Sequence, residues 1–290
     1  MRPTPDPRPD PGTPWAGGSF GERARCVLAP NASPMTLDGT NTWVLREPGA
    51  RRSVVVDPGP QDAGHLDAVA EAAGEVGVVL LTHHHLDHSE AAREFAERMG
   101  CGVRALDPAH RLGAEGLTER DVVAVDGLEV QVVATPGHTA DSLSFVIPAD
   151  RAVLTGDTVL GRGTTVVAHP DGELGAYLGS LERLHALADA REIGTVMPGH
   201  GPVIDDALAV LDFYLAHRRE RLAQVKAAVA DLSNRPHPEG LAADELPRRV
   251  VEIVYADVDP VLWGAAELSV RAQLAHLAGL AGRSAAGPDH

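Results

Sequence analysis

Four side chains able to bind a metal fall within six residues, directly after an apolar segment. His83, His85, Asp87 and His88 follow the run GVVLL at residues 77–81. Imidazole nitrogens and carboxylate oxygens are groups that zinc binds at about 2.0–2.2 Å. Four such groups without partners would be costly beside an apolar core. A solvated, histidine-rich loop is the alternative interpretation, but the spacing favours a metal site.

Three further segments each place one more such residue at the end of a strand-like run. They are TPGHT with His138, TGDT with Asp157 and PGHGP with His200. Glycine beside each of them permits tight turns and a close approach of the backbone. The four segments together offer seven ligand positions, more than one tetrahedral zinc can use. The sequence therefore predicts two metal ions in each chain, which we expect to be zinc, with iron or manganese as alternatives.

Two such ions would activate water. A shared water has its pKa lowered towards about 7, and the resulting metal-bridging hydroxide attacks a carbonyl carbon or a phosphorus. One ion stabilises the charge that develops on the electrophile, so no nucleophilic side chain is needed. Asp87 and Asp157 are the predicted catalytic carboxylates. The chain is accordingly predicted to be a metal-dependent hydrolase.

The elements that hold these residues alternate between strands and helices. The strand-like segments are residues 54–56, 77–81, a series over 121–155, and 193–198. The helical segments between them are residues 62–73, 89–99 and 173–188. Short strands in two sets with helices between them predict an α/β fold in which two sheets pack together and helices cover them.

The two ends of the chain differ from this body. Residues 1–18 are rich in Pro, Asp, Arg and Gly and are expected to be disordered. A long amphipathic helix is expected over 205–231, followed by a Pro-rich break and two or three short helices over 239–281. We therefore predict a catalytic domain over 19–204 and a small C-terminal module over 205–290.

Composition limits the classes of function. A chain of 290 residues, 44% of them hydrophobic, can build one large domain with an appendage. The net charge of −16 counts against non-specific binding of nucleic acid, although a local basic groove stays open. Two cysteines are too few for a disulfide framework, and both are expected to be core thiols. Neither a membrane span nor a signal peptide is evident, so a cytoplasmic protein is expected.

The ordered set HxHxDH, His, Asp, His resembles the pattern of the metallo-beta-lactamase superfamily over roughly residues 25–205. The resemblance implies a four-layer αββα sandwich with the site along one edge of the sheets. It assigns the first metal to His83, His85 and His138, the second to Asp87, His88 and His200, and both to a bridging Asp157. No cysteine occupies a ligand position, which makes beta-lactam hydrolysis less expected.

A second set of segments is similar to the beta-lactamase-like protein 2 family. NASPMTLDGTNT at residues 31–42 resembles that family's opening NPGPMTLxGTNT, with Ala32-Ser33 in place of Pro-Gly. The segment at residues 161–166, Tyr177 and His217-Arg218 also match. The resemblance implies a winged-helix-like C-terminal module. Animal members of the family are endoribonucleases that act on single-stranded RNA, and related fungal proteins are thioesterases.

Residues outside the ligand set have weaker assignments. Tyr177, His217 and Arg218 are predicted to contact substrate, against the alternatives of a core tyrosine and a solvated helix face. Asp57 ends a strand and is predicted to orient a ligand imidazole, or else simply to form a turn. His84 is expected to face away from its two neighbours. The other histidines, at positions 65, 110, 169, 185, 237 and 276, show no evident partner.

Two substrates remain open at this point. A thioester or ester fits the acidic chain and a similarity to hydroxyacylglutathione hydrolases, whereas single-stranded RNA fits the beta-lactamase-like protein 2 resemblance. A narrow apolar tunnel would favour an acyl chain, and a wide electropositive groove would favour RNA. The C-terminal module is predicted to form a wall of the active site. In the alternative class, the module makes the chain mainly a homodimerising or partner-binding protein with a subordinate metal site.

Overall fold

Two β-sheets packed face to face form the centre of the molecule. The computed structural model describes residues 6–8, 12, 14–234 and 244–286. The first sheet contains β1 (Gly18–Phe20), β2 (Ala24–Leu28), β3 (Asn41–Leu45), β4 (Arg52–Val56), β5 (Glu75–Leu80) and β6 (Gly102–Arg104), in that order. The second contains β7 (Val122–Val125), β8 (Leu128–Ala134), β9 (Leu143–Ile147), β10 (Ala152–Gly156) and β11 (Thr195–Pro198).

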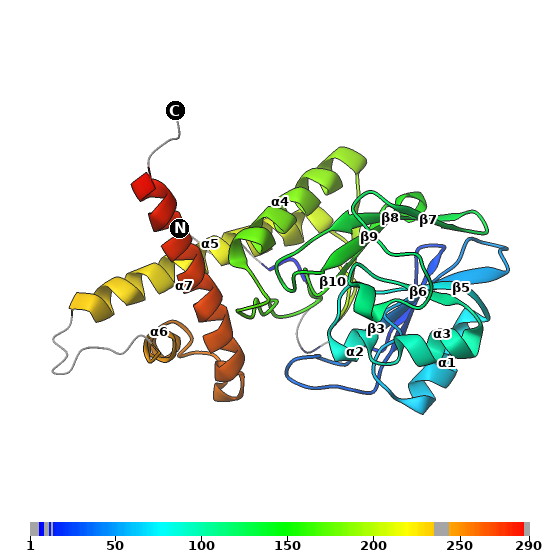
Figure 1. The fold of residues 1–290 in the computed structure, drawn as a ribbon, viewed down its shortest axis with the longest axis horizontal. Coiled ribbons are helices and arrows are strands. Elements are labelled where there is room, and N and C mark those ends of the chain that lie inside the picture. Colours follow the sequence, from blue (N-terminus) through cyan, green and yellow to red (C-terminus); the bar gives the residue numbers. More distant parts are fainter. Residues whose placement is uncertain (1–5, 9–11, 13, 235–243, 287–290) are drawn as a thin grey trace.

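Helices cover the outer face of each sheet (Figure 1). On the first sheet lie α1 (Ala63–Ala73) and α3 (Ala92–Met99), with the single-turn α2 (Leu86–Ser89) at its edge. On the second lie α4 (Leu174–Arg191) and the first half of α5 (Ala207–Asn234). The predicted α/β class and its four layers are confirmed. The helix expected over 89–99 begins earlier and is divided into α2 and α3.

Strand residues alternate between the two faces of their sheet, as a period of two requires. Val54 and Val56 of β4 face the second sheet, whereas Val55 packs beneath α1 and α3. In β10, Leu154 faces the first sheet and Val153 packs beneath α4 and α5. Because both faces are covered, these strands read as continuous apolar runs rather than as alternating ones.

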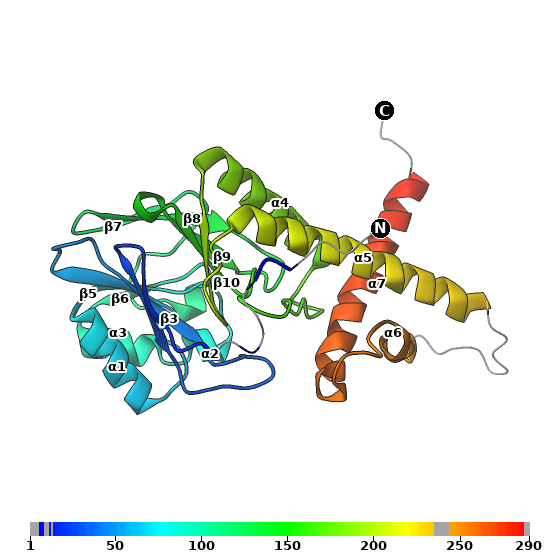
Figure 2. The ribbon, with the colours of Figure 1, turned by 180° about the vertical axis from the view of Figure 1, so that it is seen from behind.

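α5 links the sandwich to the C-terminal module. Val210 and Tyr214 in its first half belong to the layer over the second sheet. Val225 and Leu232 in its second half pack with α6 (Leu246–Val254) and α7 (Trp263–Ala286). Figures 1 and 2 show this second half extending beyond the sheets, with α7 crossing it and α6 lying nearby. A cut after residue 204 would therefore uncover the sandwich as well as remove the module.

Part of the N-terminal segment is ordered, so the prediction of disorder over residues 1–18 is wrong in part. The Trp15 ring lies 5.4 Å from the Phe20 ring, and its indole N–H donates to Asn41 Oδ1 at 2.8 Å. The Arg8 guanidinium lies 4.7 Å above the Phe213 ring. The contacts of a large aromatic ring stabilise an ordered conformation even where the surrounding residues are mostly polar. Residues 1–5, 9–11 and 13 lie outside the described residues.

Two sequence expectations concern cysteines and membranes. Cys26 is buried and Cys101 is half-buried, and both are free thiols, as expected for core positions. Within the described residues, the helices are either too short or too polar to cross a lipid bilayer.

Candidate metal centre

The carboxyl ends of four strands converge at one edge of the sandwich. β8 and β10 both run antiparallel to β9, and β11 runs parallel to β10, so these three strands end at the same edge. The segment after β5 reaches that edge from the other sheet, where Leu143 N donates to Thr82 O at 2.8 Å. The short loops that follow these strand ends carry the seven predicted ligand residues.

All seven predicted residues come together in two adjoining groups. The first group holds one potential ligand atom from each of His83, His85, His138 and Asp157, all within 4.8 Å of one another. The second group holds one such atom from each of Asp87, His88 and His200, within the same limit. The Asp157 carboxylate joins the groups, because it lies 3.7 Å from His138 Nε2 and 3.3 Å from His200 Nε2. This grouping matches the assignment implied by the resemblance.

The imidazoles are held in the orientation that a metal site requires. Nδ1 of His138 contacts Val166 O at 2.7 Å, and Nδ1 of His200 contacts Gly39 O at 3.1 Å. His83 and His88 are anchored in the same way, by Thr82 and Asp57 respectively. In these four residues Nε2 is left to face the centre of the cluster. Outer hydrogen bonds of this kind fix the tautomer and ring orientation of metal-ligating histidines.

One buried oxygen in the cluster has no hydrogen-bond partner. Asp157 Oδ1 accepts no hydrogen bond although it is inaccessible to solvent. An unsatisfied buried carboxylate oxygen is costly, and native structures contain few of them. A divalent cation between the two groups would supply the missing partner. The residues present therefore fit a metal, on the chemistry of their ligand atoms and on this unsatisfied oxygen.

Asp57 lies behind the cluster, where the sequence predicted it. Its Oδ1 accepts from Thr82 N at 2.8 Å, and its Oδ2 lies 2.9 Å from His88 Nδ1. The backbone of Asp57 is in the left-handed region with φ 51°, a conformation that aspartate tolerates better than most residues. The carboxylate is buried, so it holds the His88 ring in place rather than forming a surface turn.

The two groups differ in charge. Burial, reinforced by the positive charge of His138 when protonated, lowers the pKa of His85 to about 4. In the second group burial is outweighed by Asp157 and Asp87, which raise the pKa of His200 to about 9. His85 therefore offers a free lone pair at neutral pH, whereas the second group holds a proton that a divalent cation would displace.

Sequence reasoning missed the residues that tie the first sheet to the His200 loop. Thr40 Oγ1 donates to Asp87 Oδ2 at 2.9 Å. Asn41 Nδ2 donates to the carbonyls of Pro198 and Gly201 at 2.9 and 2.8 Å. Both residues lie in the GTNT segment that carried the family resemblance. The segment was thus visible in the sequence, but the role of Asn41 depends on contacts across more than 150 residues.

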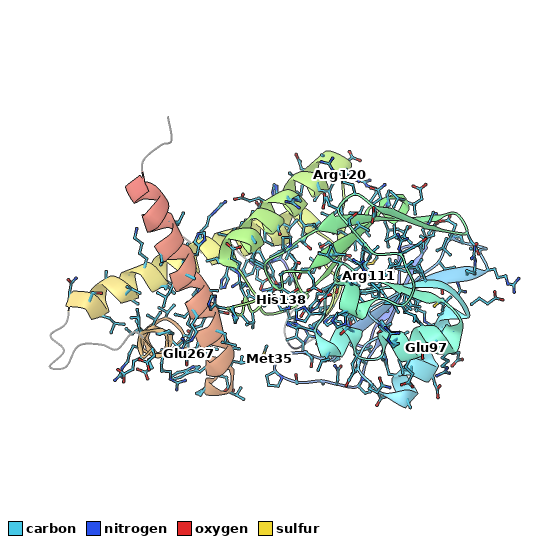
Figure 3. The ribbon with its side chains drawn as sticks, viewed as in Figure 1. Met35, Glu97, Arg111, Arg120, His138 and Glu267 are labelled. Carbon is cyan, nitrogen blue, oxygen red and sulfur yellow. The ribbon has the colours of Figure 1, made fainter. Side chains whose placement is uncertain are left out.

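A cavity of about 330 Å³ opens beside the cluster. His138 and Asp157 line it on the sandwich side, and Tyr255, Val258 and Leu262 line it from the C-terminal module. In Figure 3, His138 lies at the edge of the sandwich that faces α7. Within the described residues, the module forms a wall of this cavity without joining either group of ligand atoms, as the sequence predicted.

The structure contradicts the substrate contact predicted for Tyr177. Tyr177 lies on the buried face of α4, and its side chain is fully buried. Its hydroxyl donates to Thr158 O at 2.6 Å, and the residue does not line the cavity. Burial raises the pKa of the Tyr177 hydroxyl to about 12. By contrast, His217 and Arg218 do line the cavity. The helical periodicity of α4 allowed either placement, and the core alternative is the correct one.

Three of the other histidines have side-chain partners that the sequence did not reveal. His84 faces away from the cluster as expected, and its Nδ1 lies 2.8 Å from Asp141 Oδ1. His65 Nε2 lies 2.9 Å from Thr42 Oγ1, and His185 Nε2 lies 3.2 Å from Asp212 Oδ1. His237 lies outside the described residues.

Comparisons with known proteins agree with this architecture. Residues 35–200 match the family model described as the metallo-beta-lactamase superfamily, and residues 247–279 match a beta-lactamase associated winged helix domain. The chain is 32% identical to a beta-lactamase-like protein 2 homolog of Caenorhabditis elegans, covering 80% of this chain and 76% of that protein. It is 34% identical to an atrochrysone carboxyl ACP thioesterase of Aspergillus fumigatus, covering 74% and 67%.

A solved structure shares the fold. A beta-lactamase domain protein from Burkholderia ambifaria superposes with a TM-score of 0.74 at 23% identity, covering 93% of this chain and 90% of that one. The two-sheet sandwich and its His/Asp cluster define the class of metal-dependent hydrolases. The chain belongs to the metallo-beta-lactamase superfamily.

Proposed function

We propose that the chain is a dinuclear zinc hydrolase that acts on acyl thioesters. The observation that carries the proposal is the cavity beside the metal cluster. Its walls are largely apolar and include Leu160, Val166, Val258, Leu262 and Ala265. A cavity of about 330 Å³ lies at the small end of ligand pockets. A cavity of this size with apolar walls suits an acyl chain better than a strand of RNA, which binds along a long open groove that follows its backbone.

The similarity to an ACP thioesterase supports the same choice. The net charge of −16 also counts against a polyanionic substrate that binds along an open surface. Among the described residues, neither group of ligand atoms includes a cysteine. Cys26 is buried, with Sγ 3.3 Å from Asn41 Oδ1, and burial raises its thiol pKa well above the ordinary value.

Separate sets of residues would bind the metal ions, orient their ligands and position the substrate. His83, His85 and His138 would hold one zinc, Asp87, His88 and His200 the other, and Asp157 would contact both. When bound, the two ions supply an activated water and polarise the carbonyl of the thioester. Asp57 keeps the His88 ring oriented. The apolar walls exclude bulk water and position the acyl chain, so that its carbonyl lies beside His138 and Asp157.

Parallel assays test the proposal. The purified full chain, loaded with zinc, is offered hexanoyl-N-acetylcysteamine and a single-stranded RNA, each with and without chelator. We expect thioester hydrolysis that the chelator abolishes and added zinc restores, with the RNA left intact. Chelator-sensitive cleavage of the RNA without thioester hydrolysis would contradict the proposal.

A further inference from the structure

The cavity is basic although the chain is acidic. Three arginines line it, whereas Asp157 of the metal cluster is its one acidic residue among those described. Arg162 forms an ion pair with Asp38. Arg218 and Arg221 on α5 differ, because neither has a carboxylate within ion-pair distance among the described residues.

Arg218 is the more unusual of the two. Its side chain is only 7% exposed, and its Nε is buried without a hydrogen-bond partner. Its Nη2 donates to Thr165 O, and the guanidinium lies 4.9 Å above the Tyr177 ring. A carbonyl and an aromatic face do not neutralise a buried cation, and buried charges are normally paired. Arg218 thus has unused capacity to bind an anion.

Arg221 stands one helical turn further along the same face of α5. Its Nη1 donates to Val254 O, and its guanidinium lies 4.5 Å above the Tyr255 ring. His217 of α5 also lines the cavity. Burial together with the charges of Arg218 and Arg221 lowers the pKa of His217 to about 4, so His217 is neutral at pH 7.

We propose that Arg218 and Arg221 form an anion-binding site that selects thioesters carrying a negatively charged group. The inference rests on the proposed function and names the substrate class for that site. Guanidinium groups bind carboxylates and phosphates through paired N–H donors. The anion is a carboxylate at the end of the acyl chain or the phosphate of a phosphopantetheine thiol, since either would lie in the same cavity as the scissile thioester.

Arg218 also has a structural contact, and the test must distinguish the loss of that contact from the loss of anion binding. Thr165 accepts from Arg218 through its carbonyl, and its hydroxyl donates to the Asp157 carbonyl at 2.7 Å. If Arg218 acted only through Thr165, its replacement would disturb the metal cluster and lower turnover of every substrate alike. If it binds an anion, the loss is much larger for charged substrates than for neutral ones and the metal content is unchanged.

The experiment compares two pairs of thioesters, and the members of each pair differ in one charged group. Hexanoyl and adipoyl thioesters of N-acetylcysteamine test the acyl carboxylate, and hexanoyl thioesters of pantetheine and 4′-phosphopantetheine test the phosphate. In the wild-type chain we expect one charged member to have at least about a tenfold lower KM than its neutral partner. Arg218→Gln and, separately, Arg221→Gln should remove that advantage, so that kcat/KM falls at least about tenfold more for the charged substrate than for neutral hexanoyl-N-acetylcysteamine.

Arg219→Gln is the matched control. Arg219 follows Arg218 on α5 but is exposed and lies 3.2 Å from Glu182 Oε1, so it should behave as wild type. Equal losses on charged and neutral substrates, or reduced metal content in Arg218→Gln, would overturn the proposal. A wild-type chain that shows no preference for either charged substrate over its neutral partner would also overturn the proposal. If Arg218→Gln does not fold, Arg221→Gln decides the outcome.

Binding separates this inference from the proposed function. Amide analogues of the same compounds, in which NH replaces the thioester sulfur, are titrated by calorimetry into the zinc-loaded chain. A charged analogue that binds tighter through Arg218 supports the anion site even if no thioester is hydrolysed. Thioester hydrolysis without any such preference would overturn the anion site alone.

Discussion

Asp157→Ala is expected to lower thioester hydrolysis at least about a thousandfold, or roughly 4 kcal/mol of transition-state stabilisation. Asp157 is the residue whose carboxylate contacts both groups of the cluster, and its buried Oδ1 accepts no hydrogen bond. Its loss removes the ligand shared by the two proposed ions. Steady-state kinetics of the zinc-saturated variant, together with elemental analysis, would measure the effect.

His84→Ala is the matched control for this substitution. His84 lies between two of the proposed ligands in sequence but faces Asp141, and it is outside both groups of ligand atoms. We expect a loss of less than about tenfold and an unchanged metal content. Similar losses in the two variants at equal metal content would show that the ligand assignment is wrong.

The second large effect is expected from Gly199→Ala. A Cβ atom at Gly199 would lie 2.5 Å from Asp157 Oδ1 and 2.9 Å from His88 Cε1. Neither residue can retreat freely, because His88 is buried against Asp57 and the mostly buried Asp157 is in contact with His88 and His200. The added methyl group should displace them, and we expect at least about a hundredfold loss of activity with weaker metal retention.

Gly194→Ala provides the comparison, because a Cβ atom there meets nothing within 4 Å. It should retain activity and metal. Measurement of zinc retention during dialysis, alongside the unfolding temperature, distinguishes a damaged site from a globally destabilised fold. A Gly199→Ala variant with full activity would mean that the loop before His200 is looser than the contacts indicate.

The ligand set could be predicted because its pattern is local. Each residue follows an apolar strand and lies beside turn-forming glycine or a helix start, so neighbouring residues alone indicate a strand-end site. The contacts of Asn41 with the His200 loop join the two sheets and leave no local trace. The prediction that Tyr177 contacts substrate was wrong for a related reason. Tyr177 lies on a helix with an apolar side, and the sequence does not show which element packs against that side.

The ends of the chain show the same limit. The polar composition of residues 1–18 predicts disorder, but Trp15 packs against Phe20 and donates a hydrogen bond to Asn41. Likewise, α5 is one continuous helix, yet its two halves pack on different parts of the molecule. Such contacts depend on tertiary packing. A homodimer and a cytoplasmic location stay predictions.

The metal stoichiometry of the full chain tests the central claim most directly. The protein is stripped with chelator, saturated with zinc, freed of excess ion by gel filtration and measured by elemental analysis against its amino-acid content. The two adjoining groups of ligand atoms predict two zinc ions per chain. One zinc or none in a fully loaded, folded sample would contradict the account.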